Sequence, residues 1–380
     1  MLIAESAVVV SIEYDSPDIQ RITVKGDSCS QTERNPVNTT NTANLEPNPQ
    51  CAAICYPALT GSVSPGQRVI LNTTAVRLGL GSGGSHFVIW VEGRNTHRGQ
   101  LKGNIMKLRY TPLQVACGSA EEHSPYRSAI EAFNGLDGMP VIVCELHSML
   151  APVAAGMRAR TAFIMTDGAA LPANMSRILP ELVKHGLIMG SISCGQAFGG
   201  DLEAVNVHSA LVIARQVLKC DAAIVTMGPG IVGTGTKFGN TAIEQGPILD
   251  AVTKLGGRAI MVPRLSRMDK RPRHTPVSHH SITVLKDVCC LPCECVVASD
   301  MDADFLHSVL NALEPALEAI GHVIRLHPGS HALKTAVSAG LELSTMGRGV
   351  EQETEFFLTA AAAGAYARNQ GVTGYGDRRS

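Results

Sequence analysis

Side chains able to do acid-base, nucleophilic or ligand chemistry come directly after short apolar runs in this sequence. Glu145 and His147 follow MPVIVC, and Asp167 follows AFIMT. Cys194 follows IMGSIS, with Asp201 seven residues later. Carboxylates and histidines serve as general acids, general bases or metal ligands, and a cysteine thiolate is a nucleophile. The pattern predicts a site assembled from several loops, with Glu145, Asp167 and Cys194 as candidate catalytic residues.

The fourth apolar run, DAAIVTM, leads into a glycine-rich stretch, GPGIVGTGTKFGN, at 228–240. It is not a Walker loop, because Lys237 is followed by Phe238, and it matches a dinucleotide fingerprint only with a proline inside the match. Backbone N–H groups, threonine hydroxyls and the start of the following helix favour an anion. The predicted anion-binding residues are Gly228, Gly230, Gly233, Thr234, Gly235 and Thr236. A sharp strand-to-helix turn is the alternative interpretation.

The fifth apolar run precedes the basic segment RLSRMDKRPRHTPVSHHS at 264–281. Arginine forks fit phosphate and carboxylate groups, so three arginines are predicted to clamp an anion: Arg264, Arg271 and Arg273. Histidines shuttle protons or ligate metals, so three more residues are catalytic candidates: His274, His279 and His280. A solvated basic loop is the alternative.

A divalent metal is a candidate cofactor of these groups. His147 and Asp201 are the further candidate ligands. No strict ligand spacing such as H-E-x-x-H occurs, and acids at a helix start usually cap the helix. Cys194 lies at an elbow-like turn that lacks the usual glycines, so a buried structural thiol is its alternative interpretation. VCCLPCECVV at 288–297 predicts two short strands around a Leu-Pro turn with structural thiols.

The elements that must position these residues alternate in type from about residue 116 onward. Continuous apolar runs alternate with amphipathic segments, which predicts a Rossmann-like α/β domain at 116–380 with a mostly parallel sheet covered on both faces. Ligands of such sheets bind beyond the carboxyl ends of the strands. The chemically capable loops are therefore expected to meet at one edge.

Residues 1–115 predict a small β-barrel-like domain instead. Short segments rich in β-branched residues, such as VVVSIEY, QRITVKG and HFVIWVEG, are separated by turn residues. Trp90 is expected in the barrel core. A polar insertion at about 28–50 is expected to be disordered, because it holds almost nothing to bury.

Composition narrows the class of protein. The 380 residues carry 32 basic and 33 acidic side chains and only 4% aromatic residues, which argues against nucleic acid as the main partner. No uncharged apolar run approaches the ~20 residues of a membrane span. The 11 cysteines and the absence of a signal-peptide pattern favour a cytoplasmic protein with mostly reduced thiols.

Four stretches together resemble a known family: NTTAVRLGLGSGGSHFV, SCGQAFGGDLEAVN, MGPGIVGTGTKFG with RMDKRPRHTPVSHHS, and STMGRGVEQETEFFLTAAAAGAYA. They are similar to an uncharacterised bacterial family known as domain of unknown function 3866. The resemblance spans most of the chain outside the polar insertion. It implies a bacterial cytosolic protein and no particular reaction, and it assigns no catalytic residue.

Three functions are weighed from these observations. The first is an enzyme, a hydrolase or transferase, acting on a small phosphorylated or carboxylated metabolite. The second is a non-catalytic ligand-binding or regulatory protein that uses the same pocket. The third is a scaffold. A scaffold function does not explain why acids, histidines and arginines are expected at one edge of the sheet. A small anionic ligand is the expected partner, and a homo-oligomer is an open option.

Overall fold

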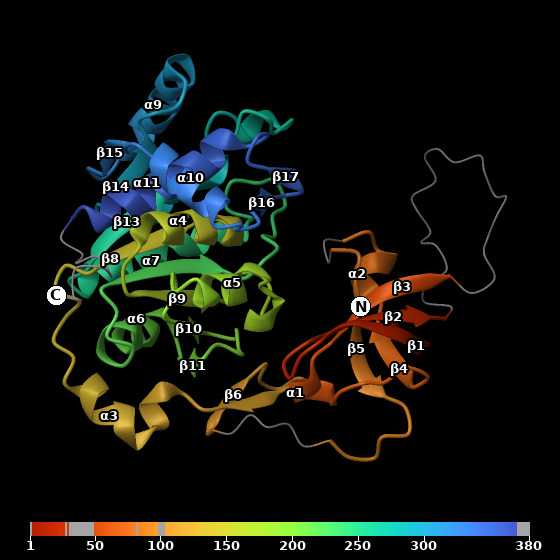
Figure 1. The fold of residues 1–380 in the computed structure, drawn as a ribbon. Helices are drawn as coiled ribbons and strands as arrows, with labels where there is room; N and C mark the ends of the chain where they lie inside the picture. Colours follow the sequence, from red (N-terminus) through yellow and green to blue (C-terminus); the bar gives the residue numbers. More distant parts are fainter. Residues whose placement is uncertain (1, 27–28, 30–48, 81–82, 98–102, 371–380) are drawn as a thin grey trace, which may run out of the picture. The chain divides into compact units, whose positions relative to one another are not determined.

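The computed structural model describes residues 2–26, 29, 49–80, 83–97 and 103–370 (Figure 1). Two compact units make up the chain, one of residues 1–102 and 108–116, the other of residues 103–107 and 117–380. Most of the insertion predicted at 28–50 lies outside the described residues.

The first unit is a closed five-stranded barrel, which confirms the predicted N-terminal architecture. Its strands follow the order β1-β2-β3-β5-β4 and are β1 (Ala4–Asp15), β2 (Gln20–Lys25), β3 (Gln50–Cys55), β4 (Arg68–Asn72) and β5 (His86–Val91). Two short helices, α1 (Pro57–Thr60) and α2 (Thr74–Arg77), lie between strands. Alternate side chains such as Val9, Val24 and Leu71 fill the interior, as the period of a strand requires.

The expectation that Trp90 lies in the barrel core is wrong. Trp90 is 37% exposed, and its indole donates to the backbone oxygen of Arg94 rather than lying in the core. A disulfide joins Cys29 to Cys51, while the other nine cysteines are free. The strand β3 that follows the insertion was not predicted, because CAAIC at 51–55 is short and has only one β-branched residue.

The second unit contains an eight-stranded, all-parallel sheet, which confirms the predicted α/β class. The strand order is β11-β10-β9-β12-β8-β13-β14-β15. The strands are β8 (Pro140–Cys144), β9 (Thr161–Thr166), β10 (Gly190–Ser193), β11 (Leu202–Glu203), β12 (Ala222–Met227), β13 (Arg258–Val262), β14 (Glu294–Ala298) and β15 (Val323–His327). β8, β9, β10 and β12 are buried along their whole length, as expected for strands covered on both faces.

Helices cover both faces of this sheet (Figure 1). One face packs against α4 (Leu150–Met157), α5 (Ile178–Lys184), α10 (Ser330–Ser338) and α11 (Thr354–Arg368). The other packs against α6 (Val207–Gln216), α7 (Gln245–Lys254) and α9 (Ala303–Leu317). The remaining elements are α3 (Ser124–Glu131), α8 (His279–Thr283), β6 (Ile105–Lys107), β7 (Val115–Cys117), β16 (Ser344–Thr345) and β17 (Arg348–Gly349).

The chain changes face at the centre of the sheet, which creates a place for a ligand. β8 and β9 are followed by helices on the first face, whereas β12 and β13 are followed by helices on the second. These four strands are neighbours in the order β9-β12-β8-β13. Loops that leave adjacent strands toward opposite faces open a crevice beyond the carboxyl ends, where ligands of α/β sheets bind.

Two glycines let α4 and α11 cross in close contact. A Cβ on Gly364 would lie 2.0 Å from the backbone oxygen of Val153, and one on Gly156 would lie 2.4 Å from that of Ala361. Only glycine permits so close an approach of two helix backbones. This crossing fixes α4, which begins just after the loop that follows β8.

Two expected elements differ from the structure. VCCLPCECVV forms a single strand, β14, preceded by the π-helical turn η7 (Val284–Val288), rather than two strands. Asp201 does not cap a helix, because α6 begins at Val207 and is capped by Asn206.

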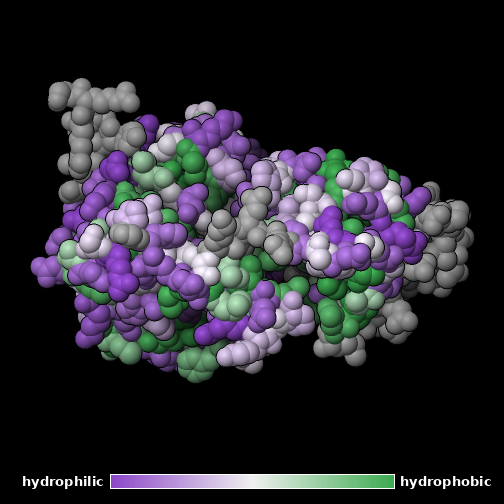
Figure 2. Space-filling view, turned by 90° about the horizontal axis from the view of Figure 1, so that it is seen from below, coloured by the Kyte–Doolittle hydropathy of each residue, from purple (hydrophilic) through white to green (hydrophobic). Residues whose placement is uncertain are grey.

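No helix in the described residues is long and apolar enough to cross a membrane. On the face shown in Figure 2, hydrophobic residues form separate groups among hydrophilic ones.

Candidate functional site

Glu145 is the acceptor at the centre of a buried hydrogen-bond network. It follows β8 directly and is fully buried. Its carboxylate accepts from Ser281 Oγ at 2.7 Å, from Ser278 Oγ at 3.3 Å and from His280 Nδ1 at 3.1 Å, with Arg264 at 3.6 Å. Burial opposes ionisation, but the His280 hydrogen bond and the Arg264 charge outweigh it and lower the pKa of Glu145.

Arg264 is a buried guanidinium held between carboxylates. It follows β13, is 2% exposed, and donates to Asp269 at 2.9 Å. Arg271 donates to the same carboxylate at 2.7 and 2.9 Å, and these bonds hold the pKa of Asp269 well below its usual range. Two of the three predicted anion-clamping arginines are therefore already paired with Asp269. The Nε of Arg264 is buried without a hydrogen-bond partner in the described part of the chain.

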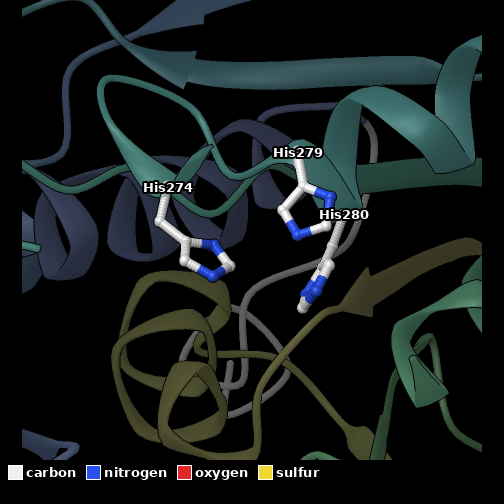
Figure 3. A group of neighbouring side chains, drawn as sticks. All are labelled: His274, His279 and His280. Atoms are coloured by element: carbon white, nitrogen blue, oxygen red, sulfur yellow. The ribbon is translucent and has the colours of Figure 1, made fainter. Parts of the chain in front are cut away.

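Three histidines converge beside this network (Figure 3). His279 and His280 open α8, and His274 lies in the turn before it, with ring centroids 4.3 to 5.1 Å apart. His274 contacts Ser278 Oγ through Nδ1 at 3.0 Å. Burial, with help from the Arg264 charge, lowers the pKa of His274 to about 3, and burial also lowers the pKa of His279. These three side chains could hold a metal ion, since one ligand atom from each lies within 4.8 Å of the others.

The glycine-rich loop after β12 folds into a small hairpin of its own. Thr234 N donates to the backbone oxygen of Gly239 at 2.8 Å, and the hydroxyls of Thr234 and Thr236 lie 3.0 Å apart. At its start, a Cβ on Gly228 would lie 2.3 Å from the backbone oxygen of Ala170, so this loop packs tightly on the loop after β9. A single 3-10 turn, η5 (Thr241–Glu244), separates the hairpin from α7, so the α-helix does not begin directly after the glycines.

The far part of the hairpin reaches the histidines and the third arginine. A Cβ on Gly233 would lie 3.9 Å from His280 Nε2, and one on Gly235 would lie 3.6 Å from the guanidinium of Arg273. Gly230 adopts a φ of +99° and faces open space. Arg273 is exposed and makes no ion pair with any residue that the structure describes. A free cation thus borders the glycine hairpin beside the histidines.

Two carboxyl groups lie at the end of β9. Asp167 accepts the backbone N–H of Gln196 at 2.8 Å. Glu244 accepts the hydroxyl of Thr166, and a Cβ on Gly168 would lie 2.6 Å from its carboxylate. Burial, reinforced by the charge of Asp167, raises the pKa of Glu244 to about 7. A carboxyl group with a pKa near neutrality can take up and release protons at physiological pH.

Three other candidates are hydrogen-bonded to neighbouring side chains or buried. His147 bonds Ser176 Oγ at 2.7 Å, and burial lowers its pKa to about 4. Asp201 accepts both the N–H and the hydroxyl of Ser191 at 2.8 Å. Cys194 is 3% exposed, and burial raises the pKa of its thiol to about 12, which opposes formation of a nucleophilic thiolate.

Sequence reasoning found most of this cluster and missed Glu244. Its signal was an acid at the start of the helical segment after the glycine stretch, which is usually a dipole partner rather than a site residue. The sequence places Ser278 beside the histidines but assigns it no role, and Ser281 was not singled out, because a serine carries no distinctive chemistry until its partners are known.

The family model described as "Protein of unknown function (DUF3866)" matches residues 52–364. The match spans both units, so the chain belongs to this family. A search of curated proteins found no match.

Proposed function

We propose that this member of the DUF3866 family is an enzyme, a hydrolase or a transferase, acting on a small phosphorylated or carboxylated metabolite. The observation that carries the proposal is an exposed arginine without an ion-pair partner among the described residues, Arg273, beside the glycine hairpin and the three histidines. Unlike the guanidinium groups of Arg264 and Arg271, that of Arg273 is not paired with a carboxylate of the described residues, so it can bind an anionic ligand.

The anion is proposed to lie between Arg273 and the hairpin residues Gly230, Gly233 and Gly235. Arginine binds phosphate and carboxylate oxygens through paired hydrogen bonds. Glycine positions leave room for an anion close to the backbone, and Gly230 faces open space. The hydroxyls of Thr234 and Thr236 bond within the hairpin, so we assign them to holding its shape rather than to gripping the ligand.

Acid-base chemistry is proposed for Glu244 together with Asp167. A protonated Glu244 can give its proton to a leaving group, while Asp167, which accepts a backbone N–H, orients a water or hydroxyl group. Two carboxyl groups in different environments suit an acid and a base at the same pH. η5, which carries Glu244, packs against α8, which carries two of the histidines.

A non-catalytic ligand-binding or regulatory protein is the second candidate. It is favoured by the heavily bonded state of Glu145 and Arg264, whose interactions with each other and with Asp269 leave few atoms for a substrate. Such a protein uses Arg273 and the hairpin for binding without turnover.

A ligand screen on the full chain tests the proposal. A thermal-shift panel of sugar phosphates, nucleotides and carboxylic acids is expected to contain compounds that raise the melting temperature, because a ligand of the native state stabilises it. Absence of any shift favours the scaffold function instead.

Arg273→Met is expected to weaken a stabilising compound about 10- to 100-fold, as measured by calorimetry. Lys254→Met is the matched control, since it removes an exposed charge in the last turn of α7. Equal affinities of both variants exclude the anion clamp. Incubation with the bound compound, followed by mass spectrometry, separates turnover from binding alone.

A further inference from the structure

Three histidines between β13 and β14 form a cluster. Their hydrogen bonds leave one ring nitrogen of each without a proton or without a partner among the described residues. Their rings converge at interplanar angles of 50° to 82° (Figure 3), and one ligand atom from each lies within 4.8 Å of the others. His274 and His280 are 2% and 6% exposed, so the cluster is largely shielded from solvent. Imidazoles packed together are either a structural core or a set of metal ligands.

Glu145 determines the tautomer of His280. An ionised carboxylate only accepts hydrogen bonds, so the contact of 3.1 Å between His280 Nδ1 and Glu145 requires a proton on Nδ1. A neutral imidazole carries one proton, and Nε2 of His280 is therefore an unprotonated lone pair. That atom faces Gly233, whose missing side chain leaves space in front of it.

Ser278 determines the tautomer of His274 in the same way. Its single hydroxyl proton goes to Glu145, at 3.3 Å, because a carboxylate is a stronger acceptor than an imidazole. Its oxygen then accepts from His274 Nδ1 at 3.0 Å and from the backbone N–H of His280 at 3.3 Å. The hydroxyl is fully used, and Nε2 of His274 is left as a second unprotonated lone pair.

His279 supplies the third atom. Its Nε2 is buried and has no hydrogen-bond partner within the described residues. A buried nitrogen without a partner is costly, and an ion shared with its two neighbours gives it one.

We propose that His274, His279 and His280 bind a divalent transition metal of the zinc type, with Glu145 and Ser278 holding two of the rings in the ligating tautomer. Imidazole nitrogen suits zinc, copper, nickel and iron, whereas magnesium and calcium select oxygen. A metal-bound histidine almost always donates its other N–H to a carboxylate or a similar acceptor.

Three protein ligands leave a fourth position of a tetrahedral ion open, as in catalytic rather than structural zinc sites. Gly233 borders His280 and Gly235 borders Arg273, so an oxygen of the anion in the proposed function is the ligand we assign to this position. The metal site itself does not depend on that assignment, and the metal is tested alone.

Titration of the chelator-treated full chain with ZnCl₂ and CoCl₂ tests the proposal. Calorimetry is expected to give one zinc ion per chain, and cobalt is expected to show the intense visible absorption of tetrahedral coordination. His279→Gln and His280→Gln are expected to weaken zinc binding by more than about 100-fold, because loss of a ligand costs at least as much as loss of its outer partner. His279 is partly exposed, so its variant is the one expected to fold most normally.

His185→Gln is the matched control, an exposed histidine at the end of α5, and it is expected to bind zinc like the wild type. Cys290→Ser removes the one exposed thiol among the free cysteines and is expected to change nothing. The proposal is overturned if the wild type binds neither metal, or if both histidine variants bind zinc with wild-type affinity. Neither result affects the anion screen, which is run without metal.

Discussion

Replacing Glu145 with glutamine removes a charge from a fully buried position while keeping the shape of the side chain. The carboxylate accepts three side-chain hydrogen bonds and faces Arg264 at 3.6 Å. Its removal leaves the buried Arg264 with Asp269 as its remaining acid, a charge that Arg271 already shares. The glutamine NH₂ group also faces donors rather than acceptors.

Removing one partner of a buried, hydrogen-bonded ion pair costs about 3–5 kcal/mol. Surface substitutions without such partners usually stay within about 0.5 kcal/mol. We therefore expect Glu145→Gln to lower the unfolding free energy of the α/β unit by about 3 kcal/mol or more. The melting temperature is expected to fall by about 6 °C or more.

Urea unfolding followed by far-UV circular dichroism at 222 nm measures this change, because the long helices belong to the α/β unit. Glu131→Gln is the matched control, since Glu131 forms an exposed pair with Arg127 on α3. If both variants unfold at the same urea concentration, Glu145 does not hold the network together.

Glu244→Gln tests the raised pKa of about 7, because a carboxyl pKa above its unfolded value stabilises the native state at low pH and loses this effect as pH rises through 7. The unfolding free energy of the variant minus that of the wild type is expected to rise by about 3 kcal/mol between pH 5 and 8.5. Parallel pH profiles of the two proteins would contradict this. Gly364→Ala is expected to destabilise by about 1–3 kcal/mol, because its methyl group meets the backbone of Val153; an unchanged melting temperature argues against the close helix crossing. Lys107→Met is expected to cost about 3–5 kcal/mol, because it leaves the carboxylate of Glu203 buried without its cation, and the double variant with Glu203→Gln is expected to recover part of the loss. No recovery in urea unfolding indicates that the two side chains act independently.

The sequence was sufficient to predict the sheet and to bring several candidate site residues to one edge of it. Continuous apolar runs such as PVIVC and AAIVTM are possible only for strands covered on both faces, and parallel strands bring their following loops together. Glu145 and the three histidines were predicted on that basis, and they do lie in one network.

Pairing within the site could not be predicted from residue types. The sequence does not distinguish Arg264, Arg271 and Arg273 from one another. The structure shows that the first two donate hydrogen bonds to Asp269. The raised pKa of Glu244 depends on burial and on the charge of Asp167, which lies 77 residues earlier in the chain. Burial of Cys194 depends likewise on its packing at the end of β10.

The histidine cluster and the glycine hairpin with Arg273 are proposed to form one site. Phosphorus-31 relaxation of inorganic phosphate, added to the cobalt-loaded full chain, measures whether an anion lies next to the histidine-bound ion. Strong relaxation is expected in the wild type and its loss in Arg273→Met, whose visible cobalt spectrum measured without phosphate is expected to match that of the wild type. Equal relaxation in both proteins, or none in the wild type, would contradict it.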